Sequence, residues 1–296
     1  MNTGVLLESG TNELEILEFK VGNNYYGINV AKIREILPYQ APTPIPNAHP
    51  CIEGIFMPRE TIITVINLAK CLNMPDLINQ TTDMNIITNF NKLNVSFHVH
   101  GVVGIHRISW EDITKPDETV NPIATGIIKF ENKLIIVLDF EKIITDISPE
   151  TGLKVSDIGR LGVRNRNEAP ILIAEDSPLL SKLIQECLTK AGYTNIISTA
   201  DGLEAWNKLQ EYKRDNVIDT SVKCIITDIE MPQMDGHHLT KLIKTDPELK
   251  DLPLIIFSSL INDEMKRKGE SIGADAQITK PEIGSLVEVI DKFILQ

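Results

Sequence analysis

The stretch CIITDIEMPQMDG, residues 224–236, decides the fold of the second half of this chain. It begins with the apolar run Cys224–Thr227, which is typical of a short strand buried inside a parallel sheet. Asp228 comes directly after this run, and Asp235 with Gly236 indicates a turn before the next helix. Because open parallel sheets gather functional groups at the carboxyl ends of their strands, Asp228 is the first candidate for a functional residue.

Short apolar runs and amphipathic stretches alternate on both sides of this segment, from residue 170 to 296. This alternation predicts strands joined by crossover helices. The strands are expected at Ile171–Ala174, Ile196–Thr199, Cys224–Thr227, Leu254–Phe257 and Ala276–Thr279. Helices are expected after them, near 180–191, 203–212, 238–244, 263–271 and 283–293. We therefore predict an α/β domain over residues 169–296 with a five-stranded parallel sheet.

The first half of the chain has a different pattern, in which apolar residues occur at every second position. This alternation covers 17–21 and 26–30, on either side of a turn at 22–24, and predicts a β-hairpin. Further strands are expected at 61–66, 84–90, 95–99, 125–130 and 133–138. These short strands predict a mainly-β domain over residues 1–147, built as one or two small barrels. Residues 148–168 have little apolar periodicity and are expected to form a solvated linker.

Composition and charge argue against several classes of protein. The formal net charge of -12 would repel a phosphate backbone, so nucleic acid is not expected as a partner. The four cysteines are scattered, without a CxxC pair, which argues against a zinc site or a disulfide framework. No secretory signal is visible, and no run reaches the roughly 18 apolar residues of a membrane span. These features favour a cytoplasmic protein that does not insert into a membrane.

Polar side chains follow four of the predicted parallel strands. Glu175 and Asp176 follow the first strand, and Asp228 ends the third. Ser258 ends the fourth strand, and Lys280 follows the fifth. We expect all of them to meet at one rim of the sheet. Carboxylates about 4 Å apart repel by roughly 4 kcal/mol at an effective dielectric near 20, so this cluster implies a counter-ion, and its all-oxygen ligands favour Mg²⁺.

The rim residues also predict a chemistry. Asp228 can act as a nucleophile towards phosphorus, while Lys280 neutralises charge on the phosphoryl oxygens and Ser258 donates a hydrogen bond to the product. Alternatively, each acidic residue is only a turn former or a helix cap, which is the interpretation we prefer for Asp235. Caps do not explain Lys280-Pro281 after the last strand, and we therefore favour the phosphoryl-acceptor hypothesis.

The ordered set of these motifs resembles the receiver domain of response regulators. The residues that carry the resemblance are Glu175-Asp176-Ser177, Asp228-Ile229-Glu230-Met231-Pro232, Asp235-Gly236, Ser258 and Lys280-Pro281. The resemblance implies a flavodoxin-like fold with Asp228 as the phospho-acceptor. It also implies that Mg²⁺ is ligated by Asp176, Asp228 and the carbonyl oxygen of Glu230, with Glu175 helping through water. Gln277 stands where the family usually has an aromatic switch residue.

The first half resembles a CheW-like coupling domain. The matching segments are Tyr26–Ile28, Ile33–Ile36, Gly54–Leu68, Gly126–Ile128 and Leu134–Leu138. Where the family has an Asn-Leu-Arg-Gly turn, this chain has Met57-Pro58-Arg59-Glu60, and Asn67 replaces the usual acidic residue. The resemblance implies two small β-barrels in tandem that dock a chemoreceptor tip and a CheA-type histidine kinase. Arg59 is the candidate for contact with a partner.

The order of a CheW-like domain followed by a receiver is that of the CheV family. It implies a chemotaxis adaptor, recruited to chemoreceptor arrays, whose coupling is regulated by Mg²⁺-dependent phosphorylation of Asp228, in adaptation or as a phosphate sink. Such an adaptor has no catalytic turnover beyond its own phosphotransfer and autodephosphorylation. The alternatives are an enzyme, either an aspartyl-phosphate phosphatase or an acidic-site nuclease, and a response regulator with another output. A DNA-binding output is opposed by the charge and by the short stretch after Lys280.

Two histidines in the first half suggest a further possibility. His98 and His100 alternate on one predicted strand and therefore lie on the same face, where they could share a metal ion. No third ligand is near them in the sequence, so we do not favour this interpretation.

Overall fold

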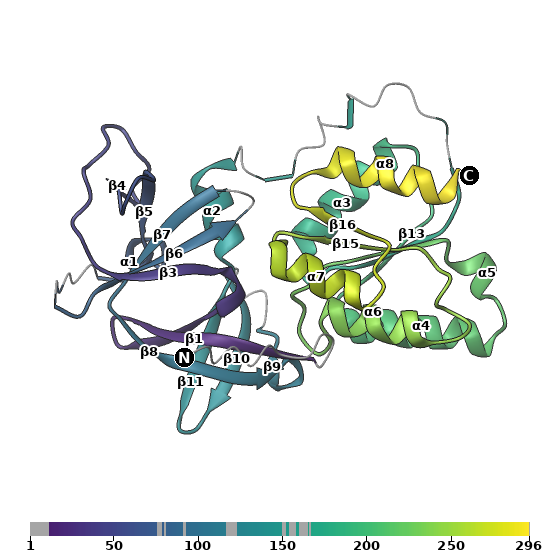
Figure 1. Cartoon of the computed structure of the whole chain (residues 1–296), viewed down its shortest axis with the longest axis horizontal. Coiled ribbons are helices and arrows are strands. Elements are labelled where there is room, and N and C mark those ends of the chain that lie inside the picture. The colour runs from purple at the N-terminus through teal and green to yellow at the C-terminus, as the bar shows by residue number, and fades with distance from the viewer. Residues whose placement is uncertain are drawn as a thin grey trace. The chain divides into compact units, whose positions relative to one another are not determined.

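The computed structural model describes residues 12–75, 79, 81–90, 93–116, 123–149, 152–153, 158–159, 165 and 167–295. The chain divides into two compact units. One unit contains the described residues 14–149, and the other contains the described residues 152–295 (Figure 1). Residues 12 and 13 are assigned to the second unit. The predicted linker at 148–168 lies largely outside the described residues. Within it, Ile158 is buried in the core of the second unit, so this segment is not solvated throughout.

The first unit contains two β-sheets. The six-stranded sheet has the order β8-β1-β2-β11-β10-β9. Its strands are β1 (Glu13–Val21), β2 (Asn24–Asn29), β8 (Gly101–Ser109), β9 (Ile113–Thr114), β10 (Ala124–Phe130) and β11 (Lys133–Leu138). The strands β1 and β2 form the predicted antiparallel hairpin, with Phe19 opposite Tyr26 and Val21 opposite Asn24. β2 and β11 pair in parallel.

The five-stranded sheet of the same unit has the order β3-β6-β7-β5-β4. Its strands are β3 (Ile33–Pro38), β4 (Ile52–Phe56), β5 (Ile63–Asn67), β6 (Met84–Phe90) and β7 (Leu93–Val99). The short helices of the first unit are η1 (Val30–Lys32), α1 (Leu68–Cys71), η2 (Trp110–Asp112) and α2 (Phe140–Ile147). Phe140 of α2 packs on Phe19, Phe90 and Phe97, so both sheets contribute side chains to one core cluster.

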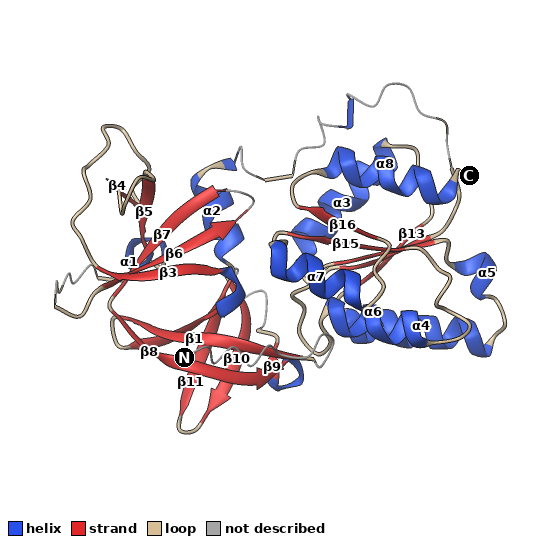
Figure 2. Cartoon of the chain, in the orientation of Figure 1, coloured by secondary structure: helices blue, strands red, loops and turns tan. Residues whose placement is uncertain are grey.

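The second unit is a doubly wound α/β domain. Its parallel sheet has the order β13-β12-β14-β15-β16. The strands are β12 (Ile171–Ala174), β13 (Ile196–Thr199), β14 (Cys224–Thr227), β15 (Leu254–Ser258) and β16 (Ala276–Thr279). The helices are α3 (Pro178–Lys190), α4 (Gly202–Arg214), α5 (Ile218–Ser221), α6 (Gly236–Thr245), α7 (Asp263–Ser271) and α8 (Ile283–Ile294). The helices α3 and α8 cover one face of the sheet, and α4, α6 and α7 lie on the other (Figures 1 and 2).

Local sequence explains where these elements begin and end. Every residue of β12 and β14 is buried, as expected for inner strands covered by helices on both faces. Ser177 caps α3 by accepting from the N–H of Leu180, and Pro178 occupies the first turn, where its missing donor costs nothing. Asp201 and Asp235 cap α4 and α6 in the same way. The predicted fold class is confirmed: a mainly-β first half and a five-stranded parallel α/β second half. None of the described helices is long and apolar enough to cross a bilayer.

Candidate functional site

The carboxyl ends of the parallel strands bring the predicted site residues to one edge of the sheet. Glu175 and Asp176 follow β12, and Asp228 follows β14, the strand beside it. Ser258 is the last residue of β15, and Lys280 follows β16. We call these five residues the acidic rim. Four of them are buried, and Asp176 is half-buried.

Lys280 joins two of the rim carboxylates. Its Nζ donates to Oδ2 of Asp228 at 2.7 Å and to Oε2 of Glu175 at 2.8 Å. All three side chains are almost fully buried, so solvent screens these ion pairs only weakly. The ammonium group therefore holds the two carboxylates at a short distance that they could not keep by themselves.

The charge balance of the rim affects the proton affinity of Glu175. Burial is the main reason why the pKa of Glu175 rises to about 7, and the negative charge of Asp228 raises it further. Lys280 acts in the opposite direction, as does the N–H of Ser177, which donates to Oε1 of Glu175 at 3.2 Å. Near neutral pH, Glu175 is therefore partly protonated unless further positive charge enters the rim.

The rim has the donor set of a hard-cation site. One carboxylate oxygen each from Glu175, Asp176 and Asp228 lies within 4.8 Å of the others. Such a group of oxygens suits Mg²⁺, which takes oxygen ligands and keeps several waters. The half-buried position of Asp176 leaves one side of the group accessible to water. The residues present therefore fit the predicted ion. The ligand role of the Glu230 carbonyl stays a prediction.

The backbone around Asp228 is closely packed. The N–H of Ile229 donates to Oδ1 of Asp228 at 2.6 Å, so both carboxylate oxygens of Asp228 have partners. Gly236 lies against the same residue, because a Cβ at this position would be 1.8 Å from the carbonyl oxygen of Asp228. Gly236 is thus required by close approach and not only by the turn that its sequence context predicts.

Ser258 and Gln277 lie on the last two strands of the sheet. The hydroxyl of Ser258 is buried and accepts from the N–H of Leu260 at 3.2 Å, which leaves its proton to be donated elsewhere. Gln277 lies beside Gly269 of α7 and donates to the carbonyl of Lys266 at 2.8 Å. Gln277 therefore makes a hydrogen bond to α7 at the position where receivers usually carry an aromatic switch residue.

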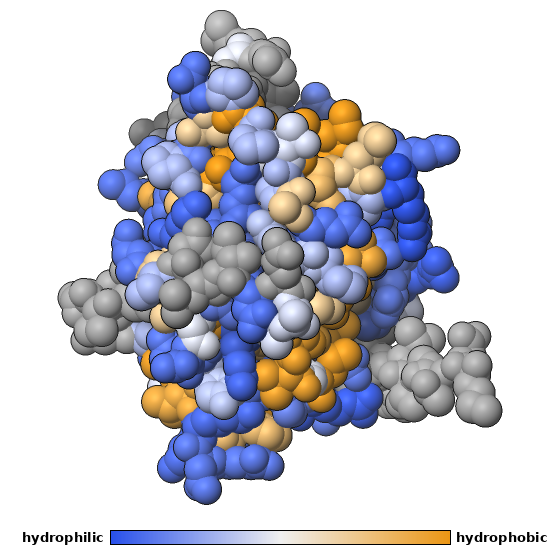
Figure 3. Space-filling model, turned by 90° about the vertical axis from the view of Figure 1, so that its left-hand side faces the viewer, coloured by the Kyte–Doolittle hydropathy of each residue, from blue (hydrophilic) through white to orange (hydrophobic). Residues whose placement is uncertain are grey.

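Arg59 lies between β4 and β5 with its side chain 80% exposed. Its backbone adopts φ of 65°, and its Nη2 donates to Oε1 of Glu35 on β3 at 2.7 Å. Met57 and Ile62, on either side of it in the chain, are 62% and 64% exposed. A space-filling view of one face of the molecule shows apolar side chains at the surface among hydrophilic ones (Figure 3). The Arg59 turn therefore presents a cation together with apolar groups.

His98 of β7 and His100, just after this strand, do not form the metal site that they could have shared. His98 is buried, with Nδ1 at 2.9 Å from Oε1 of Glu53 and Nε2 at 3.1 Å from Oδ2 of Asp83. His100 instead accepts from the N–H of Gly22 through Nδ1. Both ring nitrogens of His98 thus have carboxylate partners, which opposes the metal interpretation. Glu53 and Asp83 had no sequence signal, because their pairing with His98 is made by the sheet.

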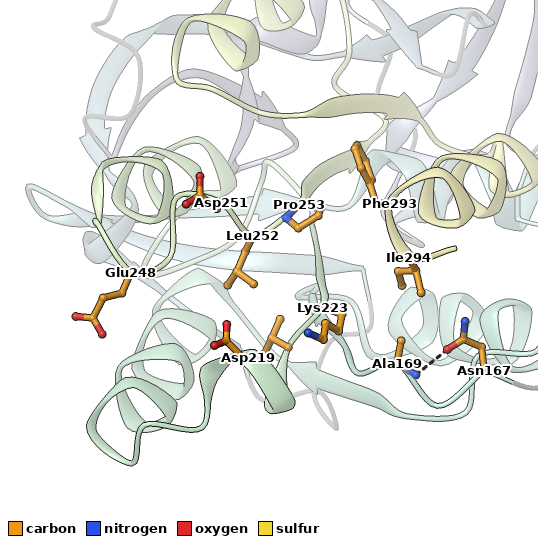
Figure 4. A pocket seen from close by; sticks show the side chains of 11 residues that line it. Asn167, Ala169, Asp219, Lys223, Glu248, Asp251, Leu252, Pro253, Phe293 and Ile294 are labelled. Atoms are coloured by element: carbon orange, nitrogen blue, oxygen red, sulfur yellow. Dashed lines mark hydrogen bonds between the residues drawn. The ribbon is translucent and has the colours of Figure 1, made fainter. Parts of the chain in front are cut away.

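A cavity of about 580 Å³ lies at the other edge of the parallel sheet (Figure 4). Its lining includes Ala169, Lys223 and Pro253, each of which lies shortly before a strand, whereas the acidic rim follows the strands. The cavity is therefore separate from the rim. Its charged lining residues are Asp219, Lys223, Glu248 and Asp251.

Comparison with known families supports this division. The model of the CheW-like domain matches residues 15–148, and the model of the response regulator receiver domain matches residues 171–291. The chain is thus a two-domain signalling protein, in which a coupling domain precedes a receiver. From here on, the unit of residues 14–151 is called the coupling domain and the parallel α/β domain the receiver.

Similarity to individual proteins identifies the family more closely. The chain is 31% identical to chemotaxis protein CheV3 of Helicobacter pylori over 299 residues, which is 95% of each chain. It is 25% identical to CheV1 of the same species, over 96% of this chain and 94% of that protein. Its first half is 30% identical to chemotaxis protein CheW of Thermotoga maritima, over 50% of this chain and 98% of that protein. The chain belongs to the CheV family of chemotaxis coupling proteins.

Proposed function

We propose that this chain couples chemoreceptors to a CheA-type histidine kinase and that phosphorylation of Asp228 regulates this coupling, in adaptation or as a phosphate sink. One observation carries the proposal. Lys280, Asp228 and Glu175 are joined by short ion pairs at the carboxyl edge of the sheet, beside Asp176. This is an arrangement of nucleophile, cation and acidic ligands that suits phosphoryl transfer.

The chemistry follows from the groups around Asp228. An oxygen of its carboxylate attacks the phosphorus of a phosphohistidine, so that a P–O bond forms while the P–N bond breaks and the leaving imidazole takes up a proton. Lys280 donates to Oδ2 of Asp228, and from this position its ammonium group can stabilise the negative charge on the phosphoryl oxygens. Ser258, whose hydroxyl proton is not used in its bond with Leu260, is suited to donate to the acyl phosphate.

Glu175, Asp176 and Asp228 would hold the Mg²⁺ ion, together with the carbonyl of Glu230. When bound, the ion supplies charge neutralisation for the transferring group. Glu175 has a pKa of about 7 because it is buried beside Asp228, and added positive charge would favour its ionised form. Metal binding is therefore expected to release a fraction of a proton near neutral pH, which makes it weaker in acid.

The coupling function rests on the first domain. Its exposed Arg59, with Met57 and Ile62 on either side, offers the combination of a cation and apolar surface that protein interfaces favour. We assign this turn to contact with the receptor tip or the kinase, at membrane-associated receptor arrays. The chain would act there as an adaptor without turnover of an external substrate.

Labelling tests the acceptor. With Mg²⁺ and acetyl phosphate, or with a phosphorylated histidine kinase, wild-type protein should gain one phosphoryl group and lose it again when hydroxylamine cleaves the acyl phosphate. Asp228→Ala should gain none, whereas the control Asp215→Ala, at an exposed site of the same domain, should be labelled normally. Retained label in Asp228→Ala would remove the assignment. Sustained hydrolysis of phosphomonoesters by wild-type protein would favour the enzyme alternative instead.

Co-sedimentation tests the coupling surface. Full-length protein should sediment with receptor and kinase assemblies, and Arg59→Ala should reduce the bound fraction several-fold. Arg34→Ala is the matched control, because Arg34 is also an exposed arginine of the coupling domain and bonds to Asn94. If both variants bind as wild-type protein does, the Arg59 turn is not the contact. If wild-type protein does not sediment with the assemblies, the coupling proposal itself fails.

A further inference from the structure

Asn12, the residue directly before β1, is bound by the receiver. The Nδ2 of Asn12 donates to the carbonyl of Gln233 at 2.9 Å, and its Oδ1 accepts from the N–H of Asp235 at 3.0 Å. The side chain is buried, with 7% of the residue exposed. Asn12 belongs by its contacts to the receiver unit, while the coupling domain begins two residues later at Leu14. We call these two hydrogen bonds the Asn12 clasp.

The clasp suits an asparagine in particular. Asn12 has φ of 60°, a left-handed conformation that asparagine tolerates better than most other residues with a side chain. Its short amide both donates and accepts, so that one side chain satisfies a backbone carbonyl and a backbone N–H that are two residues apart. Gln233 also has a left-handed φ, of 66°, which shapes the loop that Asn12 meets.

The loop held by the clasp is the one that follows Asp228. Its first residue, Ile229, donates from its N–H to Oδ1 of Asp228, and its carbonyl accepts from the N–H of Gly236 at 2.9 Å. The loop also includes Glu230, the expected carbonyl ligand of the metal. Its far end is fixed by Asp235, which caps α6 through the N–H of His238 at 2.8 Å. A short run of backbone therefore joins the carboxylate of Asp228 to both partners of Asn12.

Phosphorylation has to disturb this loop. Oδ1 of Asp228 accepts from Ile229, and Oδ2 accepts from Lys280, so a phosphoryl group on either oxygen must share or replace one of these partners. A displaced Ile229 would move the loop against Gly236, which has no spare room beside the carbonyl of Asp228. Packed loops of this kind change between discrete arrangements and do not deform continuously.

We propose that Asn12 is a positioning residue that transmits the phosphorylation state of Asp228 to β1: the clasp holds in the unphosphorylated receiver and is released on phosphorylation. This inference rests on the proposed phosphoryl acceptance at Asp228. Only Glu13 separates Asn12 from the first residue of the coupling domain, so a change at the clasp reaches that domain along the backbone. Release of the clasp loosens the first residues of β1, the central partner of β8 and β2.

Hydrogen exchange of the full-length protein tests the clasp, with Mg²⁺ and beryllofluoride in place of the phosphoryl group. In wild-type protein, adding Mg²⁺ and beryllofluoride should alter amide hydrogen exchange at residues 228–236 and increase it at residues 12–17. In Asn12→Gly, which keeps the left-handed backbone accessible but removes both hydrogen bonds, residues 12–17 should exchange rapidly without the ligand and should not respond to it. The response at 228–236 should remain, which also establishes that the variant receiver is folded.

The matched control is Asn47→Gly, because Asn47 is an exposed turn residue of the coupling domain with φ of 56°. It should respond as wild-type protein does. Linkage adds a second readout: if phosphorylation releases the clasp, Asn12→Gly should bind beryllofluoride several-fold more tightly than wild-type protein or Asn47→Gly.

The outcomes separate the two proposals. A response at residues 12–17 that persists in Asn12→Gly, or an unchanged affinity for beryllofluoride, overturns the role of Asn12 and leaves phosphoryl acceptance intact. An absence of response at 228–236 in wild-type protein contradicts phosphoryl acceptance at Asp228, and the transmission route falls with it.

Discussion

At the scale of single residues, Lys280 decides the state of the acidic rim. Glu175 and Asp228 are both buried and both within 2.8 Å of its ammonium group. A buried carboxylate without a counter-charge is costly. The raised pKa of Glu175 shows that the charge of Lys280 does not fully offset burial and the negative charge of Asp228. The meeting of these side chains could be predicted from the sequence, because each of them follows a recognisable strand and the ends of parallel strands lie at one edge.

Lys280→Met should lower the free energy of unfolding of the receiver by about 3–5 kcal/mol, because two buried carboxylates then lose their partner. Millimolar Mg²⁺ should restore part of this loss, since the ion replaces the missing charge. Urea unfolding with and without Mg²⁺ measures both effects, and the exposed Lys182→Met is the control. Equal stability of Lys280→Met and Lys182→Met would contradict the ion-pair account.

Two glycines of the receiver differ sharply in their surroundings. Gly236→Ala should cost at least about 2 kcal/mol, because its Cβ would meet the carbonyl oxygen of Asp228 at 1.8 Å. Gly284→Ala, in α8, has no atom within 4 Å of the new Cβ and should stabilise by up to about 1 kcal/mol through helix propensity. Thermal unfolding of both variants checks the contrast, and the same sign of change in both would contradict it.

At the scale of elements, the two halves of the chain differ in how well the sequence predicts them. Four of the five receiver strands, β12, β13, β14 and β16, have the predicted bounds, because short, mostly apolar runs between helices leave little choice of register. β15 extends one residue further, to Ser258. In the coupling domain, β3, β4, β8 and the two-residue β9 were not predicted as strands. β8 carries two glycines and a mixed burial pattern, and β3 has no buried residue, so neither shows the alternation that marks a strand.

The contacts of His98 and Asn12 could not be predicted from the sequence, because their partners lie far away along the chain. The partners of His98 are Glu53 on β4 and Asp83 before β6, and no local pattern connects these positions. The same holds for Asn12, which meets residues more than two hundred positions away. Such contacts depend on the order of the strands in each sheet and on the path of the chain between them, which a local sequence pattern does not reveal.

The His98 cluster gives the five-stranded sheet a defined pH dependence. Burial alone would lower the pKa of His98, but its bonds and charge interactions with Glu53 and Asp83 outweigh burial and raise the pKa above its ordinary value of 6.5. Burial would likewise raise the pKa of Glu53, but His98 and two neutral donors lower it below 4.5. A basic group whose pKa is higher in the folded state than in the unfolded state stabilises the fold while it is protonated. The stabilisation by His98 is therefore complete below about pH 6.5, the pKa in the unfolded chain, and is lost as the pH rises through the higher pKa of the folded state.

Wild-type protein should therefore lose coupling-domain stability as the pH is raised, and His98→Gln should lack this component. Because the chain has two tryptophans, Trp110 and Trp206, a Trp206→Phe background lets Trp110 fluorescence follow the coupling domain alone. His100→Gln, next on the same face, should keep the wild-type slope. A stability profile of His98→Gln that parallels wild-type protein across this range would contradict the charged cluster.

At the scale of the whole molecule, the two described residues before Leu14 do not belong to the coupling domain. Asn12 and Glu13 are assigned to the same compact unit as residues 152–296, and residues 14–151 form the other unit. The Asn12 clasp gives the residue directly before β1 a contact with the loop that follows Asp228. Domain order was predictable from the sequence, whereas this contact was not, because residues 1–13 have no receiver motif.

The measurement that tests the central claim most directly is co-sedimentation of the full-length chain with receptor and kinase assemblies, with and without an acetyl phosphate and Mg²⁺ treatment. Phosphorylation of Asp228 should change the bound fraction of wild-type protein several-fold, and Asp228→Ala should bind equally under both conditions. A bound fraction of fully labelled wild-type protein equal to that of unlabelled protein would contradict regulation of coupling by the receiver.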